Sequence, residues 1–223
     1  MIKLIHGDCL EEMPKLEAGS VDLILADPPY GIDYQSARRT DKDKWFDKIE
    51  NDEEPFLDWI EQSVRLLKPT GCILCFCRWD VQEVFKEEIS KYFTIKSQVI
   101  WDRVIHGMGD LKGAFSPQHD VIWFATNKDF SFPNKRPSSV IKIQRLSADK
   151  LTHPTEKPLA LYRRLINSTT KKGDVVLDPT FGSGVAAEAC FIEDRNFIGI
   201  EKDLDYFAIA EKRIAAAQPA LFA

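Results

Sequence analysis

The 223-residue sequence lacks a long hydrophobic run, a metal-binding pattern and an excess of positive charge. No apolar stretch approaches the roughly 18 residues that a membrane-spanning helix needs, so we expect no membrane partner. The four histidines show no metal-ligand spacing, and a net charge of −5 is not typical of a nucleic-acid-binding protein. Residues 1–8 resemble a first strand more than a signal peptide, which predicts a cytoplasmic protein.

Cysteine is also sparse, with five residues. Cys72 and Cys75 form a C-x-x-C pattern, which can mark zinc binding or redox chemistry. They fall in an apolar, strand-like run at 72–77, where residues three apart point to opposite faces. A structural zinc ion needs four converging ligands, so we expect no metal site here.

Strand and helix patterns alternate along the chain, which predicts an α/β fold with a mostly parallel, doubly wound sheet in a single domain, 1–223. Leu57, Ile60, Val64 and Leu67 recur at helical spacing, and the polar segment 68–71 is expected to end that helix. Strands are expected at 2–5, 21–26, 72–77, 95–101, 120–125, 174–178 and 196–201, and helices at 9–16, 55–67, 80–91, 157–169, 185–193 and 203–217.

Two long segments break this alternation. Residues 31–54 are polar and charged, and we expect a mobile loop beside the active edge of the sheet. Residues 127–152 form a short basic insertion, since six basic and two acidic residues between 128 and 150 give a local charge of +4. An ordinary solvated loop is the alternative interpretation.

The tetrapeptide Asp27-Pro28-Pro29-Tyr30 directly follows the apolar run 21–26. Two prolines cannot donate hydrogen bonds to a neighbouring strand, so the strand must end there. Ligands bind at the carboxyl ends of strands in open α/β sheets. The carboxylate, a free carbonyl and the aromatic ring suit a planar substrate that carries an amine.

A second candidate site begins where the apolar run ending at Asp178 is followed by a glycine-rich turn, 181–184, and then a helix. Glycine allows close approach of the backbone to a ligand. The full G-x-G-x-x-G pattern is absent, so a dinucleotide site is not indicated. The next strand ends at Glu201, a position suited to binding the ribose hydroxyls of a nucleoside.

Together these motifs resemble the amino-group DNA methyltransferases. The matching segments are Asp-Pro-Pro-Tyr at 27–30, His-Pro-Thr-Glu-Lys-Pro at 153–158 and Asp-Pro-Thr-Phe-Gly-Ser-Gly at 178–184. The tetrapeptide precedes the glycine turn, which is the circularly permuted motif order of the beta class. Gly7-Asp8 and residues 65–71 also match the spacing of that family.

The resemblance implies a Rossmann-like methyltransferase fold with S-adenosylmethionine as cofactor. Glu201 would bind the ribose hydroxyls, and Asp8 the adenine amine, because its strand should neighbour the strand that ends at Glu201. Asp178 would lie near the ammonium group, and Thr155 and Lys157 would hold the carboxylate. The methionine part would lie against Phe181, Gly182, Ser183 and Gly184, and Asp27 is also expected to contact the cofactor.

The implied reaction is methylation of an exocyclic amine on a base flipped out of DNA. Asp27 and the Pro28 carbonyl would accept the amine hydrogens, and Tyr30 would stack on the base. In this family an initial Asp accompanies adenine and an initial Ser accompanies cytosine, so we expect adenine. Cytosine-amine methylation, RNA or protein methylation, and a non-catalytic nucleic-acid binder with this fold stay open as alternatives.

Further partners follow from the resemblance. A homodimer is expected, and 127–152 occupies the interval where the family places target recognition. Gln218–Phe222 resembles a peptide that docks on the replication sliding clamp, although it could be a frayed helix end packed on the domain. Double-stranded DNA is expected to meet Arg38, Arg39, Lys42, Lys44, Lys135, Arg136, Lys142 and Arg145.

Overall fold

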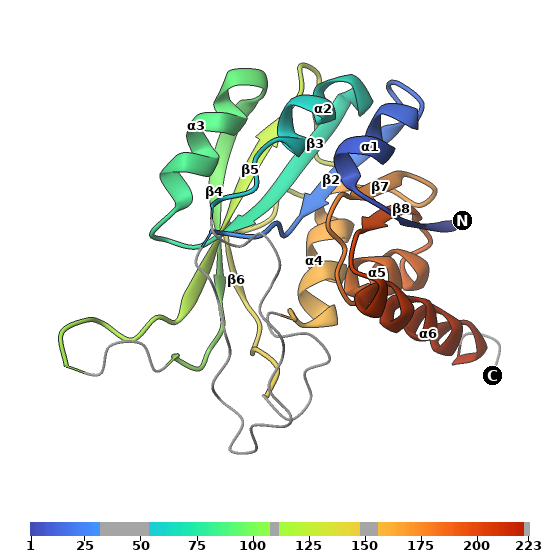
Figure 1. Cartoon of the computed structure of the whole chain (residues 1–223). Coiled ribbons are helices and arrows are strands. Elements are labelled where there is room, and N and C mark those ends of the chain that lie inside the picture. Colours follow the sequence, from blue (N-terminus) through green and yellow to red (C-terminus); the bar gives the residue numbers. More distant parts are fainter. Residues whose placement is uncertain (32–53, 108–111, 148–155, 221–223) are drawn as a thin grey trace.

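The computed structural model describes residues 1–31, 54–107, 112–147 and 156–220. One eight-stranded sheet has the order β1-β8-β7-β2-β3-β5-β4-β6 (Figure 1). Only β5 runs antiparallel to its neighbours, which confirms the predicted mostly parallel sheet. The strands are β1 (Ile2–His6), β2 (Val21–Ala26), β3 (Leu67–Cys77), β4 (Thr94–Asp102), β5 (His119–Thr126), β6 (Val140–Lys142), β7 (Val175–Asp178) and β8 (Asn196–Glu201).

Helices cover both faces of the sheet, as a doubly wound fold requires (Figure 1). Along β2, Leu23 lies in the core with α4 and α5, whereas Ile24 lies in the core with α2 and α3. Cys72 and Cys75 likewise lie in opposite cores, which confirms that they face away from each other. One face carries α1 (Cys9–Glu12), the 3-10 helix η1 (Met13–Lys15), α2 (Trp59–Leu66) and α3 (Gln82–Tyr92), and the other α4 (Leu159–Thr169), α5 (Val185–Ile192) and α6 (Leu204–Ala220).

The expected boundary between a helix at 55–67 and a strand at 72–77 was wrong. Helix α2 is shorter, and β3 already begins at Leu67, which pairs with Val21. Farther along, the amide of Asn127 donates to the Gly71 carbonyl at 3.0 Å. Residues 67–71 are therefore extended because distant backbone groups bond to them, despite their turn-like composition.

The basic insertion is not entirely loop. Strand β6 lies within 127–152 and pairs in parallel with the end of β4. It contains only three residues, of which the middle one, Ile141, is buried. A strand this short has no recognisable alternation, so its sequence did not predict it.

The first and last strands are neighbours. His6 pairs with Glu201, and the amide of Gly7 donates to the Glu201 carbonyl at 2.9 Å. Strands β1, β8, β7 and β2 are adjacent and parallel, so their carboxyl ends share one border of the sheet, here called the catalytic edge. Within the described ranges, no helix is both long and apolar enough to cross a membrane.

Candidate active site

Four carboxylates follow the strands that end at the catalytic edge. Asp178 and Glu201 are the last residues of β7 and β8, and Asp8 and Asp27 come shortly after β1 and β2. Asp178 is 2% exposed, and burial raises its pKa well above the usual value, with Asp27 and Glu201 adding to the rise. The edge therefore gathers carboxyl groups whose ionised forms are poorly solvated, and a nearby cation would favour their ionisation.

Asp27 accepts hydrogen bonds from two side chains. The Tyr30 hydroxyl donates to Oδ1, and the Lys157 ammonium donates to Oδ2. Lys157 is 5% exposed, and its ammonium also lies 4.6 Å from the centre of the Phe76 ring. A buried ammonium ion is costly without a carboxylate partner, so Lys157 and Asp27 compensate each other's charge.

Tyr30 remains a hydrogen-bond donor because of its surroundings. Burial is the largest cause that raises its pKa well above the usual value, and the charge of Asp27 adds to it. Its ring meets Phe85 edge-on at a centroid distance of 6.2 Å. The hydroxyl thus stays protonated and holds one oxygen of Asp27.

The backbone of the tetrapeptide is braced by residues 54–56. The Phe56 amide donates to the Pro29 carbonyl at 3.1 Å. Gly31 has φ +73°, and a Cβ there would lie 2.5 Å from backbone atoms of Glu54 and Pro55. Gly31 is thus needed for this close approach. Sequence reasoning missed it, although a glycine directly after the tetrapeptide was a usable signal.

The glycine turn is tied to the end of β8. The Gly182 amide donates to Glu201 Oε2, and the Asp203 amide to Oε1, both at 2.8 Å. Burial is the largest cause of the raised pKa of Glu201, and these hydrogen bonds oppose it. The Phe181 ring is 5% exposed and packs against Phe197, so the core holds most of that side chain.

Asp8 lies beside Glu201, as the strand order required. Its Oδ1 accepts from the Leu10 amide at 2.9 Å and caps α1. Its Oδ2 pairs with Lys202 at 3.2 Å, and both side chains are largely or partly exposed. Exposed ion pairs are weak, so a ligand amine could replace Lys202 at little cost.

A family model described as DNA methylase matches residues 21–212, a range that contains both the tetrapeptide and the glycine turn. The chain belongs to the DNA methylase family. It is 32% identical to the Type II methyltransferase M.HpaI of Haemophilus parainfluenzae over 95% of this chain and 74% of that protein. It is 28% identical to the DNA adenine methyltransferase YhdJ of Escherichia coli K12, over 96% and 83% respectively.

A solved structure supports the same fold for this methylase. The crystal structure of the M1.HpyAVI–SAM complex superposes with a TM-score of 0.72 at 27% identity. The match covers 96% of the methylase chain and 100% of the other chain.

The basic residues expected to meet DNA divide into three groups. Strand β4 runs parallel to β2, so Asp102 at its end lies at the catalytic edge. Lys142 ends β6 and pairs with Asp102, and the Arg145 amide donates to the Arg103 carbonyl at 3.2 Å. Both basic residues therefore lie at the catalytic edge of the methylase. Lys135 and Arg136 are exposed but precede β6, so strand register does not bring them there. Outside the described residues lie Arg38, Arg39, Lys42, Lys44 and the expected cofactor ligand Thr155.

The methylase anchors Lys157 through a residue that the sequence did not indicate. Arg213 of α6 pairs with Glu156 at 2.7 Å and with Glu188 of α5 at 3.2 Å. Glu156 directly precedes Lys157, so this network fixes the segment that carries the ammonium. The glutamate was visible in the His-Pro-Thr-Glu-Lys-Pro motif, but its partner lies 57 residues away.

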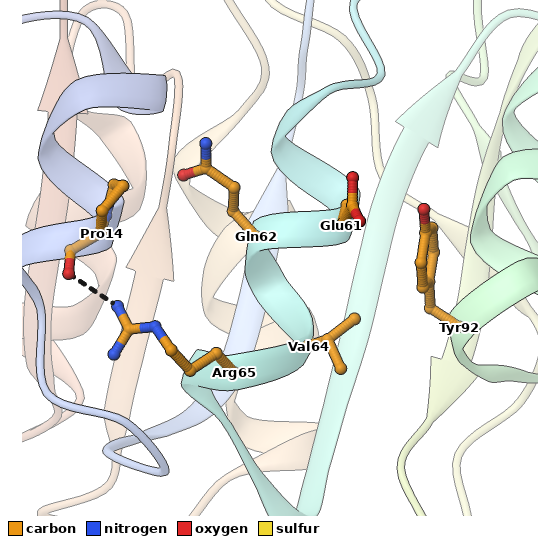
Figure 2. A pocket seen from close by; sticks show the side chains of 6 residues that line it. All are labelled: Pro14, Glu61, Gln62, Val64, Arg65 and Tyr92. Atoms are coloured by element: carbon orange, nitrogen blue, oxygen red, sulfur yellow. Dashed lines mark hydrogen bonds between the residues drawn. The ribbon is translucent and has the colours of Figure 1, made fainter.

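A surface hollow of about 390 Å³ lies elsewhere, between η1, α2 and α3 (Figure 2). There Arg65 donates to the carbonyls of Met13 and Pro14 at 3.0 Å and to that of Leu16 at 2.8 Å. Arg65 sits near the end of α2, just before β3 begins, and so belongs to the opposite border of the sheet. We infer that these hydrogen bonds of Arg65 hold η1 against α2. The hollow is lined by Pro14, Glu61, Gln62, Val64, Arg65 and Tyr92.

Proposed function

We propose that this protein transfers a methyl group from S-adenosylmethionine to the N6 amine of adenine in double-stranded DNA, in the cytoplasm and on the nucleoid. The observation that carries the proposal is the position of Asp27, with Tyr30 beside it, at a strand end next to Asp178 and Glu201. An acceptor for an amine thus adjoins the buried Asp178 and the partly buried Glu201. The initial Asp supports adenine over cytosine, as does the similarity to YhdJ.

The residues at the catalytic edge fit this cofactor. Asp8 suits an aromatic amine, Glu201 a pair of hydroxyls and Asp178 an ammonium group. Burial raises the pKa of both Asp178 and Glu201, so ionising them in the folded protein is unfavourable until a cation lies close by. S-adenosylmethionine, when bound, supplies a methyl group on a positively charged sulfur.

Asp27 and the Pro28 carbonyl each accept one hydrogen from the target amine in this mechanism. These bonds favour a pyramidal nitrogen and leave its lone pair directed at the methyl carbon. As the nitrogen–carbon bond forms and the carbon–sulfur bond breaks, positive charge develops on the nitrogen, and the nearby carboxylate stabilises it. Asp27 then accepts the proton that the nitrogen loses. Positioning supplies much of the remaining acceleration.

Lys157 couples ligand binding to this chemistry. Its ammonium bonds to Asp27 Oδ2, so it competes with the target amine for the lone pairs of that oxygen until the ammonium moves. A ligand carboxylate, with Thr155 as its second donor, is a suitable new partner for the ammonium. The target base would stack on Tyr30 after leaving the duplex, at a cost of about a few kcal/mol for unstacking.

The test is incubation of the protein with methyl-labelled S-adenosylmethionine and, separately, duplex DNA, RNA and protein. We expect label only in DNA, recovered as N6-methyladenine after digestion to nucleosides. Label in N4-methylcytosine would correct the base, and label in RNA or protein would overturn the substrate. Cofactor binding without any transfer would favour a non-catalytic binder. Methylome sequencing of DNA from expressing cells would then identify the recognition sequence.

Target recognition completes the proposal. Residues 127–152 are the proposed recognition segment, and their short length predicts a short recognition sequence or help from a second copy of the chain. Light scattering with and without DNA would detect such a homodimer. A DNA affinity that does not change with salt would contradict phosphate contacts by the basic residues.

A further inference from the structure

Arg213 of α6 joins two segments of the chain that flank the candidate site. Its guanidinium donates to Glu156 at 2.7 Å and to Glu188 at 3.2 Å. The side chain of Glu156 is 5% exposed, and that of Arg213 is 18% exposed. A buried carboxylate needs a cation, and the planar guanidinium can reach two carboxylates at once, so Arg213 holds both in place. These three residues are here called the Arg213 bridge.

One end of the Arg213 bridge is the residue next to Lys157. A residue before proline favours an extended backbone, and Lys157 precedes Pro158. Neighbouring side chains in an extended segment point to opposite sides. The contacts agree, because Glu156 meets α6 whereas Lys157 reaches Asp27. The bridge therefore fixes the backbone from which the Lys157 side chain extends.

The other end of the Arg213 bridge belongs to the helix that follows the glycine turn. Glu188 lies in the first turn of α5, and its amide donates to the Gly184 carbonyl at 3.0 Å. Gly184 in turn lies against Ala210, one helical turn before Arg213, and a Cβ on Gly184 would lie 2.6 Å from the Ala210 Cβ. Helices α5 and α6 lie side by side (Figure 1). They support the glycine turn and the bridge together.

The charges of the Arg213 bridge also reach the catalytic edge. Burial raises the pKa of the Tyr162 hydroxyl on α4 well above its usual value. Three carboxylates raise this pKa further and one guanidinium lowers it, namely those of Asp27, Asp178, Glu156 and Arg213. The bridge and the carboxylates of the catalytic edge thus surround the same side chain.

We propose that Arg213 is a positioning residue for recognition of the cofactor carboxylate. The Arg213 bridge holds Lys157 where its ammonium can reach either Asp27 or that carboxylate. This inference rests on the proposed function, in which S-adenosylmethionine is the cofactor and Lys157 binds its carboxylate. It adds a residue of α6, far from the sequence motifs, to those that determine cofactor binding.

The test measures the binding of two ligands by calorimetry, S-adenosylmethionine and its decarboxylated form, which lacks only the carboxylate. We expect Arg213→Met to weaken binding of S-adenosylmethionine about tenfold, because a displaced ammonium forfeits a charge-assisted hydrogen bond. Binding of the decarboxylated ligand, which makes no such bond, should stay within about twofold of wild type. Urea unfolding of the same samples shows that each variant is folded.

Two further variants frame this result. Arg213→Lys should weaken binding of S-adenosylmethionine less, about fivefold, because lysine keeps the charge but not the planar fork. It carries the same comparison of ligands if Arg213→Met does not fold. The matched control is Arg163→Met, which breaks an ion pair of 2.5 Å with Glu193 that joins α4 to the end of α5. This control should leave the binding of both ligands unchanged.

A double-mutant cycle tests whether Arg213 acts through Lys157. Lys157→Met should itself weaken binding of S-adenosylmethionine selectively, and adding Arg213→Met should then cause no further loss. Additive losses would overturn the inference. So would equal weakening of both ligands by Arg213→Met, which is the result expected if Arg213 only stabilises the fold, or an unchanged affinity for S-adenosylmethionine. Failure of the wild type to bind S-adenosylmethionine would instead refute the proposed function, and the inference with it.

Discussion

At the scale of single residues, Lys157 has a position that its motif did not predict. The motif suggests contact with a cofactor carboxylate, whereas the structure pairs the ammonium with Asp27 and places it over Phe76. Both contacts are possible in turn, because a lysine ammonium on a four-carbon stem can reach two partners. In the proposed mechanism, Lys157 releases Asp27 for the substrate when the ammonium turns to the cofactor carboxylate.

Asp27→Ala should abolish methylation, with a loss of at least about 100-fold, because an acceptor aimed at the developing charge is removed. Cofactor binding should survive in part. Transfer assays and equilibrium dialysis measure the two effects. Methylation near the wild-type rate in this variant would contradict the mechanism.

The same substitution should also destabilise the protein. It leaves the Lys157 ammonium, which is 5% exposed, without its carboxylate, at a cost of about 1–3 kcal/mol in the free energy of unfolding. The double variant Asp27→Ala with Lys157→Met should recover most of that stability in urea titrations and none of the activity. If the double variant is no more stable than Asp27→Ala, the ion pair is not the cause.

Asp178→Asn should change how stability depends on pH. Burial raises the folded-state pKa of Asp178 above its ordinary 3.8, so its contribution to stability is full below pH 3.8 and is lost as pH rises through the raised value. Asparagine does not ionise and can keep the hydrogen bond from the Thr180 amide. The variant should therefore gain stability relative to wild type as pH rises, measured by urea unfolding without cofactor. A difference that is constant with pH would refute this.

At the scale of secondary structure elements, the packing of α5 on α6 depends on Gly184. Its φ is +81°, and a Cβ there would lie 2.6 Å from the Cβ of Ala210. Gly184→Ala should lower the free energy of unfolding by about 2–4 kcal/mol, which combines a left-handed backbone and an overpacked contact. Urea or thermal unfolding measures this loss.

Gly173→Ala is the matched control. Gly173 has φ +84°, but an added Cβ would meet no atom within 4 Å. Gly173→Ala should therefore lower the free energy of unfolding by only about 1–2 kcal/mol, the cost of the left-handed backbone alone. Equal losses in the two variants would mean that α6 moves aside and that its contact with α5 is not tight.

The sequence predicted those elements that carry their own signal. Residues 21–26 and 196–201 form strands as expected, because each is a short apolar-rich run that packs between two helical layers. The prediction was wrong for residues 67–71 because the residues that pair with them, among them Val21 and Asn127, lie far away in the sequence. The sequence did not predict strand β6 because its three residues are too few to show an alternation of apolar and polar residues.

In the candidate site, too, the sequence predicted the features that have a local signal and missed the contacts between distant residues. Asp27, Asp178 and Glu201 could be placed at one edge, since each comes at or just after the end of a buried parallel strand. The bond between Lys157 and Asp27 joins residues 130 positions apart, and no local pattern encodes such a contact. Sequence reasoning therefore predicted where the functional groups gather but not how they pair.

At the scale of the whole molecule, the C-terminal segment contains the peptide that resembles a clamp-docking sequence, Gln218–Phe222. Helix α6 reaches Ala220, and residues 221–223 lie outside the described part. If Gln218–Phe222 docks on the replication sliding clamp, deletion of 218–223 should abolish clamp binding. Surface plasmon resonance with immobilised clamp measures this.

Methylation by the deletion variant without the clamp should match wild type, which separates docking from catalysis. Gln218→Ala is a milder variant that should weaken docking without shortening the chain. Unchanged clamp binding after the deletion would remove this interaction from consideration.

The neighbouring positions of β1 and β8 have a consequence for synthesis on the ribosome. In the sheet, β8 and β7 lie between β1 and β2, although they are made last. Until residues 175–201 emerge, β2 presents an unpaired border, which invites association with other chains. Asp27 is therefore made long before the glycine turn and Glu201, so a half-made chain carries the tetrapeptide without most of the proposed cofactor site. Interrupted translation would yield aggregation-prone fragments rather than a partly active enzyme.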